Sequence, residues 1–88
     1  MKVYLDIETD KRGNICVIGM FKKPDRFIQL HGNNITTDDV EKFISEAQTI
    51  VTFNGDSFDL PVIKRYLNLD LKVSHTSHDL FKVKKRLG

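Results

Sequence analysis

Hydrophobic and polar residues alternate along the first eight positions of the chain. Val3, Leu5 and Ile7 fall on one side of this pattern and polar or charged residues fall on the other, with the period of two that is typical of a β-strand. Two further β-rich apolar runs follow, separated by turn-forming residues. Short strands with tight connections favour an antiparallel meander. The predicted strands cover residues 2–8, 15–21 and 26–30.

The spacing of the hydrophobic residues lengthens after Thr36. Apolar positions now recur at intervals of three and four, behind hydroxyl and acidic residues that suit a helix N-terminus. A short β-branched run then indicates a buried parallel strand, and Asn54-Gly55-Asp56 indicates a turn into a second amphipathic helix. The remaining predicted elements are a helix from residues 36–39 to Ala47, a strand over 49–53, a helix over 58–67, a strand over 71–74 and a helix that begins at Leu80.

This order of elements is typical of an α/β fold with a mixed sheet, in which three antiparallel strands are followed by parallel ones. With 88 residues, the chain has room for one small domain spanning residues 1–88. It contains no apolar run long enough to cross a bilayer and no signal peptide at its N-terminus, so we expect a cytoplasmic protein. Its single cysteine, Cys16, lies among β-branched residues and is expected to be buried and reduced.

Basic residues are concentrated near the C-terminus. Residues 72–88 contain five basic residues and one acidic residue, whereas residues 1–71 have a net charge of −2. A basic strip of this kind attracts a polyanion such as nucleic acid, and a solvated helix face would show the same pattern.

Asp6 and Glu8 form the first candidate site. They are two residues apart on a predicted strand, so their carboxylates emerge from the same face, where a divalent metal ion would offset their repulsion. A half-exposed strand that turns both side chains to water is the alternative. If the fourth strand lies beside the first in parallel, the turn after it brings Asp59 to the same end, where Asp59 can join the acidic pair. The alternative, which is compatible with this role, is that Asp59 or Ser57 caps the helix.

Two short motifs resemble those of a known family. Asp6-Ile7-Glu8-Thr9 is similar to the first exonuclease motif of the DEDD 3′–5′ exonucleases, which have a ribonuclease H-like fold. Asn54-x-x-x-Phe58-Asp59-x-Pro61 resembles their second motif, in the form seen in the proofreading domains of B-family DNA polymerases and in predicted prokaryotic exonucleases. The resemblance runs from about Met1 to Phe81 and covers nearly the whole chain.

The resemblance implies a metal-dependent nuclease that hydrolyses phosphodiester bonds of DNA or RNA from a single-stranded 3′ end. Asp6, Glu8 and Asp59 would be the catalytic carboxylates and would bind two Mg²⁺ or Mn²⁺ ions. Asn54 would position the substrate, while Phe58 would pack the turn or stack on a terminal base. The residues expected to contact nucleic acid are Thr9, Asn54, Phe58, Lys82, Lys84, Lys85 and Arg86.

The sequence departs from the family at its C-terminal end. The family has a fourth acidic ligand on a late helix, and this chain stops before it. Asp79 is the candidate replacement, although in such folds the matching Asp caps a helix. His75 and His78 are expected to be a solvent-facing pair, with a general-base role as the alternative.

The missing helix leaves two open questions about the chain. Without it, one face of the sheet would be uncovered, so we expect self-association or a partner chain. The alternatives to an active nuclease are a catalytically inactive nucleic-acid-binding or protein-interaction module and one part of a split nuclease.

Overall fold

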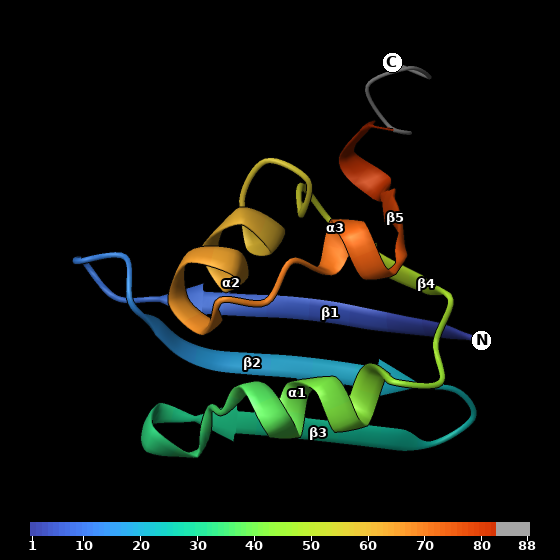
Figure 1. The fold of residues 1–88 in the computed structure, drawn as a ribbon, viewed down its shortest axis with the longest axis horizontal. Helices are drawn as coiled ribbons and strands as arrows, with labels where there is room; N and C mark the ends of the chain where they lie inside the picture. Colours follow the sequence, from blue (N-terminus) through green and yellow to red (C-terminus); the bar gives the residue numbers. More distant parts are fainter. Residues whose placement is uncertain (83–88) are drawn as a thin grey trace.

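The structure is a computed structural model, and it describes residues 1–82. Five strands form one sheet in the order β3-β2-β1-β4-β5 (Figure 1). The elements are β1 (Lys2–Thr9), β2 (Ile15–Lys22), β3 (Arg26–His31), a 3₁₀ turn η1 (Gly32–Asn34), α1 (Thr37–Ile44), β4 (Thr49–Thr52), α2 (Asp59–Leu67), α3 (Leu71–Ser74) and β5 (Thr76–Asp79). The predicted mixed α/β sheet is confirmed.

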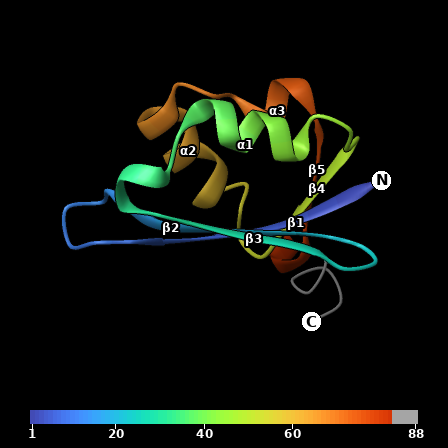
Figure 2. The same ribbon diagram turned by 90° about the horizontal axis from the view of Figure 1, so that it is seen from below.

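The first three strands form the expected antiparallel meander, and β4 and β5 add to the other edge in parallel. Figure 2 shows that α1, α2 and α3 all lie on one side of the sheet, whereas the short helical segment at residues 80–82 lies on the other. Both crossovers, from β3 to β4 and from β4 to β5, run through helices on the same side. Among residues 1–82, the only helical segment on the second face of the sheet is therefore the short one at residues 80–82.

The core lies between the sheet and the three helices. Val3, Leu5 and Ile7 are buried on the helical side of β1, as their alternation predicts, and α1 and α2 pack apolar side chains against them. Burial of each aliphatic side chain of this size contributes about 1.5–3 kcal/mol to folding. Thr36 caps α1 by accepting a hydrogen bond from the N–H of Asp39 (3.2 Å). No helix in the described part of the chain is long and apolar enough to cross a membrane.

The predicted strand over residues 71–74 is wrong, because this segment is the helix α3. Asp70 accepts a hydrogen bond from the N–H of Lys72 (3.2 Å), which starts a helical turn, and Leu71 is its only buried residue while Val73 is 83% exposed. The last strand comes later, at Thr76–Asp79, where Asp79 pairs with Thr52 of β4. The helix predicted to begin at Leu80 is present at residues 80–82.

Cys16 is exposed, so the expectation that it is buried is wrong. The pairing of β1 with β2 shifts by one residue here: Glu8 pairs with Val17, whereas Thr9 pairs with Ile15. Cys16 is the extra residue of this bulge, and a bulged residue leaves the regular alternation of a strand. The apolar neighbours of Cys16 are therefore a poor guide to its burial.

Candidate active site

The site forms where β4 ends and leaves the second half of β1 without a partner on that edge. β1 pairs with β4 only from Lys2 to Tyr4. Beyond this point α2 approaches the strand, and the carboxylate Oδ2 of Asp59 accepts a hydrogen bond from the backbone N–H of Ile7 (3.1 Å). Since Ile7 lies between Asp6 and Glu8, this bond brings Asp59 to the acidic end of β1.

Asp59 does not cap its own helix, which was the alternative from the sequence. The N-cap of α2 is Phe58, and no side chain makes a capping hydrogen bond there. Asp59 itself is 4% exposed. Burial raises the pKa of Asp59 to about 6, the Ile7 N–H opposes this rise, and the negative charge of Asp6 adds to it. A buried carboxylate next to another acidic group is an environment that a cation would stabilise.

Asp6 and Glu8 are exposed on the open face of the sheet, opposite Gly19 and Val17 of β2. Their carboxylates and that of Asp59 supply only oxygen ligands, which suits Mg²⁺ or Mn²⁺. The structure does not gather them fully: within residues 1–82, no three Asp, Glu, His or Cys side chains are grouped closely enough to hold a metal ion. The oxygen ligands therefore suit a hard divalent cation, but among the described residues the three carboxylates do not surround a single binding position.

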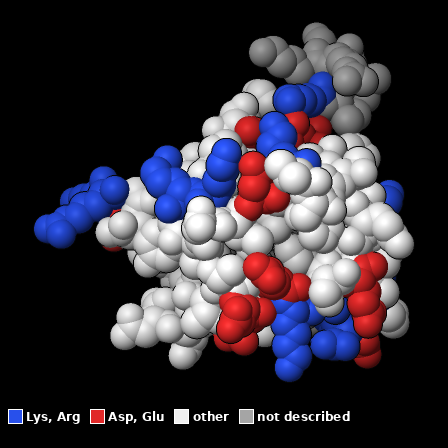
Figure 3. All heavy atoms as spheres, viewed as in Figure 1, with Lys and Arg blue, Asp and Glu red and all other residues white. Residues whose placement is uncertain are grey.

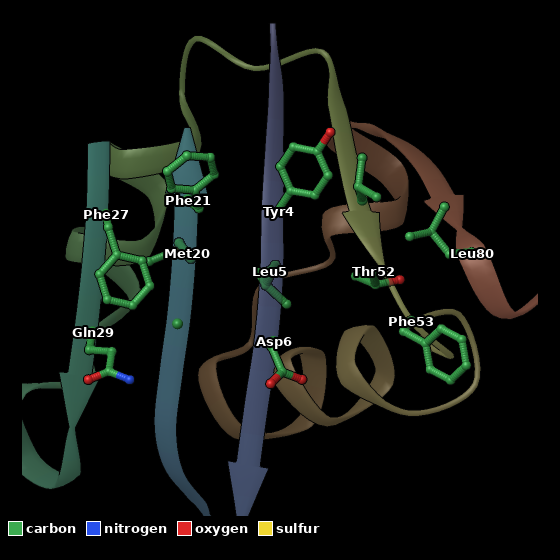
Figure 4. A pocket seen from close by; sticks show the side chains of 12 residues that line it. Tyr4, Leu5, Asp6, Met20, Phe21, Phe27, Gln29, Thr52, Phe53 and Leu80 are labelled. Atoms are coloured by element: carbon green, nitrogen blue, oxygen red, sulfur yellow. The ribbon is translucent and has the colours of Figure 1, made fainter. Parts of the chain in front are cut away.

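A groove of about 480 Å³ lies beside Asp6 on the open face of the sheet. Figure 4 shows the Asp6 side chain at this groove, with Gln29 on the β3 side and Phe53 on the β4 side. Gly19, directly opposite Asp6, contributes no side chain and keeps the groove open. A Cβ at this position would make only ordinary contacts, the nearest being with the carbonyl oxygen of Asp6 (3.9 Å).

A row of side chains that is apolar on four strands and ends at a histidine on β5 crosses the sheet next to the acidic pair. The strand registers place its members opposite one another, and the rings of Tyr4 and Phe21 are 6.3 Å apart. The alignment of these residues depends on the register of each strand pair, which the sequence alone does not reveal. The row consists of Phe27, Phe21, Tyr4, Val51 and His78.

The turn between β4 and α2 is tightly built. Asn54 adopts a positive φ of 63°, a conformation that Asn tolerates better than most residues. Gly55 passes so close to β4 that a Cβ there would lie 2.0 Å from Oγ1 of Thr52. The side chain of Phe58 is 41% exposed and therefore does not pack fully into the core. Thr9 is half-buried at the end of β1.

Asp56, in the same turn, was not a candidate from the sequence. Its carboxylate accepts hydrogen bonds from Nζ of Lys82 (2.5 Å) and from the hydroxyl of Ser77, and Nζ of Lys72 lies 3.9 Å away. The hydrogen bond from Lys82 is the main cause that lowers the pKa of Asp56. Lys82 is thus paired, and Lys84, Lys85 and Arg86 lie outside the described residues.

Acidic and basic side chains are interspersed over the helical side of the molecule (Figure 3).

The two histidines are each half-buried, so they only partly match the solvent-facing pair that was expected. His75 is half-buried, with Nε2 3.2 Å from the carbonyl oxygen of Ile44. His78 is half-buried on β5, and Asp79 is buried at the end of the same strand.

Comparison with known proteins gives one family and one structural match. A model of the RNase H superfamily matches residues 3–88. No curated protein matches the sequence significantly. The family B DNA polymerase from the hyperthermophilic archaeon Pyrobaculum calidifontis is similar in structure, with a TM-score of 0.73 and 14% sequence identity. The match covers 96% of this chain and 16% of the polymerase chain, so it supports the fold.

Proposed function

Because the chain belongs to the RNase H superfamily, we propose that it is a metal-dependent nuclease domain that hydrolyses phosphodiester bonds of DNA or RNA from the 3′ end. Asp6, Glu8 and Asp59 are its catalytic carboxylates. The observation that carries the proposal is the hydrogen bond from Ile7 N–H to Asp59, because it joins residues 52 positions apart at the strand segment that holds both other acids.

The proposed cofactor is a pair of Mg²⁺ or Mn²⁺ ions. When bound, such ions activate a water molecule and stabilise the leaving oxygen of a phosphodiester. Asp6 and Glu8 supply their oxygens from the open face, and Asp59 supplies a carboxylate from the N-terminal end of α2. Because burial raises the pKa of Asp59, ionising this carboxylate costs free energy, and a bound cation would offset that cost.

The proposed substrate contacts surround these acids. Thr9 follows Glu8 at the end of β1, and Asn54 and Phe58 belong to the turn that leads to Asp59. Phe58 is exposed enough to stack on a terminal base, and Lys82 carries a charge close to the same turn. The C-terminal basic residues are proposed to contact the phosphate groups of the nucleic acid. The proposed location of the protein is the cytoplasm.

The test is digestion of single-stranded DNA and RNA, labelled separately at the 3′ and 5′ ends, with Mn²⁺ or Mg²⁺ and with an EDTA control. Wild-type protein is compared with identically purified Asp6→Asn and with Asp38→Asn, which changes an exposed acid in the first turn of α1. We expect shortening from the 3′ end by the wild type and by Asp38→Asn, and none by Asp6→Asn. Equal cleavage by all three proteins would identify a contaminant and reject the proposal.

A second candidate function is a module that binds nucleic acid or protein without cleaving it. It is favoured by one observation: the described residues contain no ready-made group of three metal-ligating side chains. Folded protein that binds the labelled strands in the presence of Mg²⁺ but leaves them intact would support this candidate. The same result would be expected for one part of a split nuclease, and cleavage restored by a second polypeptide would identify that case.

We also propose that a second copy of the chain covers the open face of the sheet. The support is the row of largely apolar side chains that crosses this face, of which Phe27 is 62% exposed. Size-exclusion chromatography with light scattering should show a dimer for the wild type and a monomer for Phe27→Ser. The matched control is Tyr66→Ser, which removes an exposed aromatic residue from α2 and should leave the dimer intact. A monomeric wild type across micromolar concentrations would contradict this proposal.

A further inference from the structure

The carboxylate of Asp79 is buried at the point where β5 ends beside β4. Its Oδ1 accepts hydrogen bonds from the backbone N–H groups of Asn54 (2.7 Å) and Phe81 (2.9 Å), and its Oδ2 accepts one from the N–H of Asp56 (3.2 Å). The bond to Phe81 is the expected helix cap. The bonds to Asn54 and Asp56 reach across to a different segment, the turn that leads from β4 to α2.

This turn connects Asp79 to the candidate active site. The carbonyl oxygen of Asn54 accepts a hydrogen bond from the N–H of Phe58 (3.0 Å), and that of Gly55 accepts one from the N–H of Leu60 (2.8 Å). Both bonds close the turn directly onto the start of α2, where Asp59 is the first residue. Fixing the N–H groups at residues 54 and 56 therefore also fixes the position from which Asp59 reaches Ile7.

We propose that Asp79 is a positioning residue that holds the β4–α2 turn so that Asp59 meets the acidic end of β1, and that it is not the fourth metal ligand. The functional meaning of this role rests on the proposed nuclease function, while the positioning itself does not.

The hydrogen bonds of Asp79 argue against direct metal binding. A carboxylate that ligates a metal must turn at least one oxygen toward the ion. Both oxygens of Asp79 already accept N–H groups, and the residue is 4% exposed. Breaking these bonds would leave buried backbone N–H groups without partners, which costs about 1–3 kcal/mol for each group.

The test is amide hydrogen exchange, measured by NMR in EDTA, on the wild type, Asp79→Asn and Asp79→Ser. The Asn variant keeps the size of the side chain but turns one N–H acceptor into a donor. The Ser variant can still cap the helix at Phe81 and is too short to hold the turn. The matched control is Asp70→Ser, because Asp70 also accepts a backbone N–H, at the start of α3. The reporter is the amide of Ile7, which is bonded to Asp59.

We expect the Ile7 amide to exchange about tenfold faster in both Asp79 variants relative to the amides of β2, and to be unchanged in Asp70→Ser. Unchanged Ile7 protection in the Asp79 variants would overturn the inference. So would an equal loss at Ile7 and throughout β2, or loss of the folded spectrum in both variants, since either would mean that Asp79 only stabilises the fold as a whole. The readout involves no metal and no cleavage, so it stands whether or not the nuclease proposal fails.

Discussion

The raised pKa of Asp59 predicts that the protein becomes more stable when this carboxylate is neutral. Its pKa moves from an ordinary 3.8 to about 6, mainly because the side chain is buried. A group whose folded-state pKa is raised binds more protons in the folded than in the unfolded state between these two values, so stability falls as pH rises through that window. At about 1.36 kcal/mol for each pKa unit, the ionised carboxylate costs about 3 kcal/mol at pH 7.

The perturbation is Asp59→Asn, whose amide oxygen can still accept the hydrogen bond from Ile7. The quantity of interest is the free energy of unfolding of the variant minus that of the wild type, both in EDTA. We expect this difference to be about 2–3 kcal/mol larger at pH 7 than at pH 4. Urea unfolding followed by circular dichroism at pH 4, 5, 6 and 7 measures this difference. Comparison with the variant cancels the titration of groups common to both proteins.

Added Mg²⁺ provides the second part of the same experiment. At pH 7 the ion should stabilise the wild type more than Asp59→Asn, because it offsets the charge that the variant lacks. A difference between the two proteins that stays constant from pH 4 to pH 7 would refute the reasoning. Such a result would mean that the carboxylate titrates as an ordinary solvated group.

Three further predictions follow from other contacts. Asp56→Ala should destabilise the protein by about 1–2 kcal/mol at pH 7 in urea unfolding, and by less below pH 4, because the lowered pKa of Asp56 contributes stability that is lost as pH falls; an equal loss at both pH values would contradict this. Gly55→Ala should cost more than about 2 kcal/mol, because its Cβ would overlap the side chain of Thr52, and an unchanged urea midpoint would count against the turn geometry. Cys16 should react with a thiol reagent in native buffer as fast as in urea; reaction only after unfolding would show that it is buried.

The first four strands and the helices α1 and α2 could be predicted from the sequence, because the hydrophobic pattern of each is local. The alternation through Val3, Leu5 and Ile7 fixes which side of β1 is buried. The segment after Asp70 was misread because four residues with one buried apolar side chain suit a strand or a helix turn equally well. Cys16 was misread because a bulge depends on pairing with another strand, which no local pattern reveals.

The acidic residues of the site could be identified from spacing and motif, whereas the contacts that position them could not. Asp6 and Glu8 share a face because of strand geometry alone. The bonds of Asp79 to the N–H groups of Asn54 and Asp56 link residues more than 20 positions apart, and they exist only after β5 has paired with β4. Asp56 itself gave no signal in the sequence, because a charged residue in a turn is ordinary.

The short ladder between β1 and β4 has a consequence for how the protein folds. The β1–β2–β3 meander uses neighbouring residues and closes short loops, so it is expected to form early. The contact of Ile7 with Asp59 spans 52 residues and requires β4, the turn and α2 to dock first. In a partly folded chain, Asp6 and Glu8 are therefore already side by side while Asp59 is still absent. We therefore expect the acidic centre to be completed only after β4 and α2 dock, so that a chain folded as far as the meander holds two of its three carboxylates.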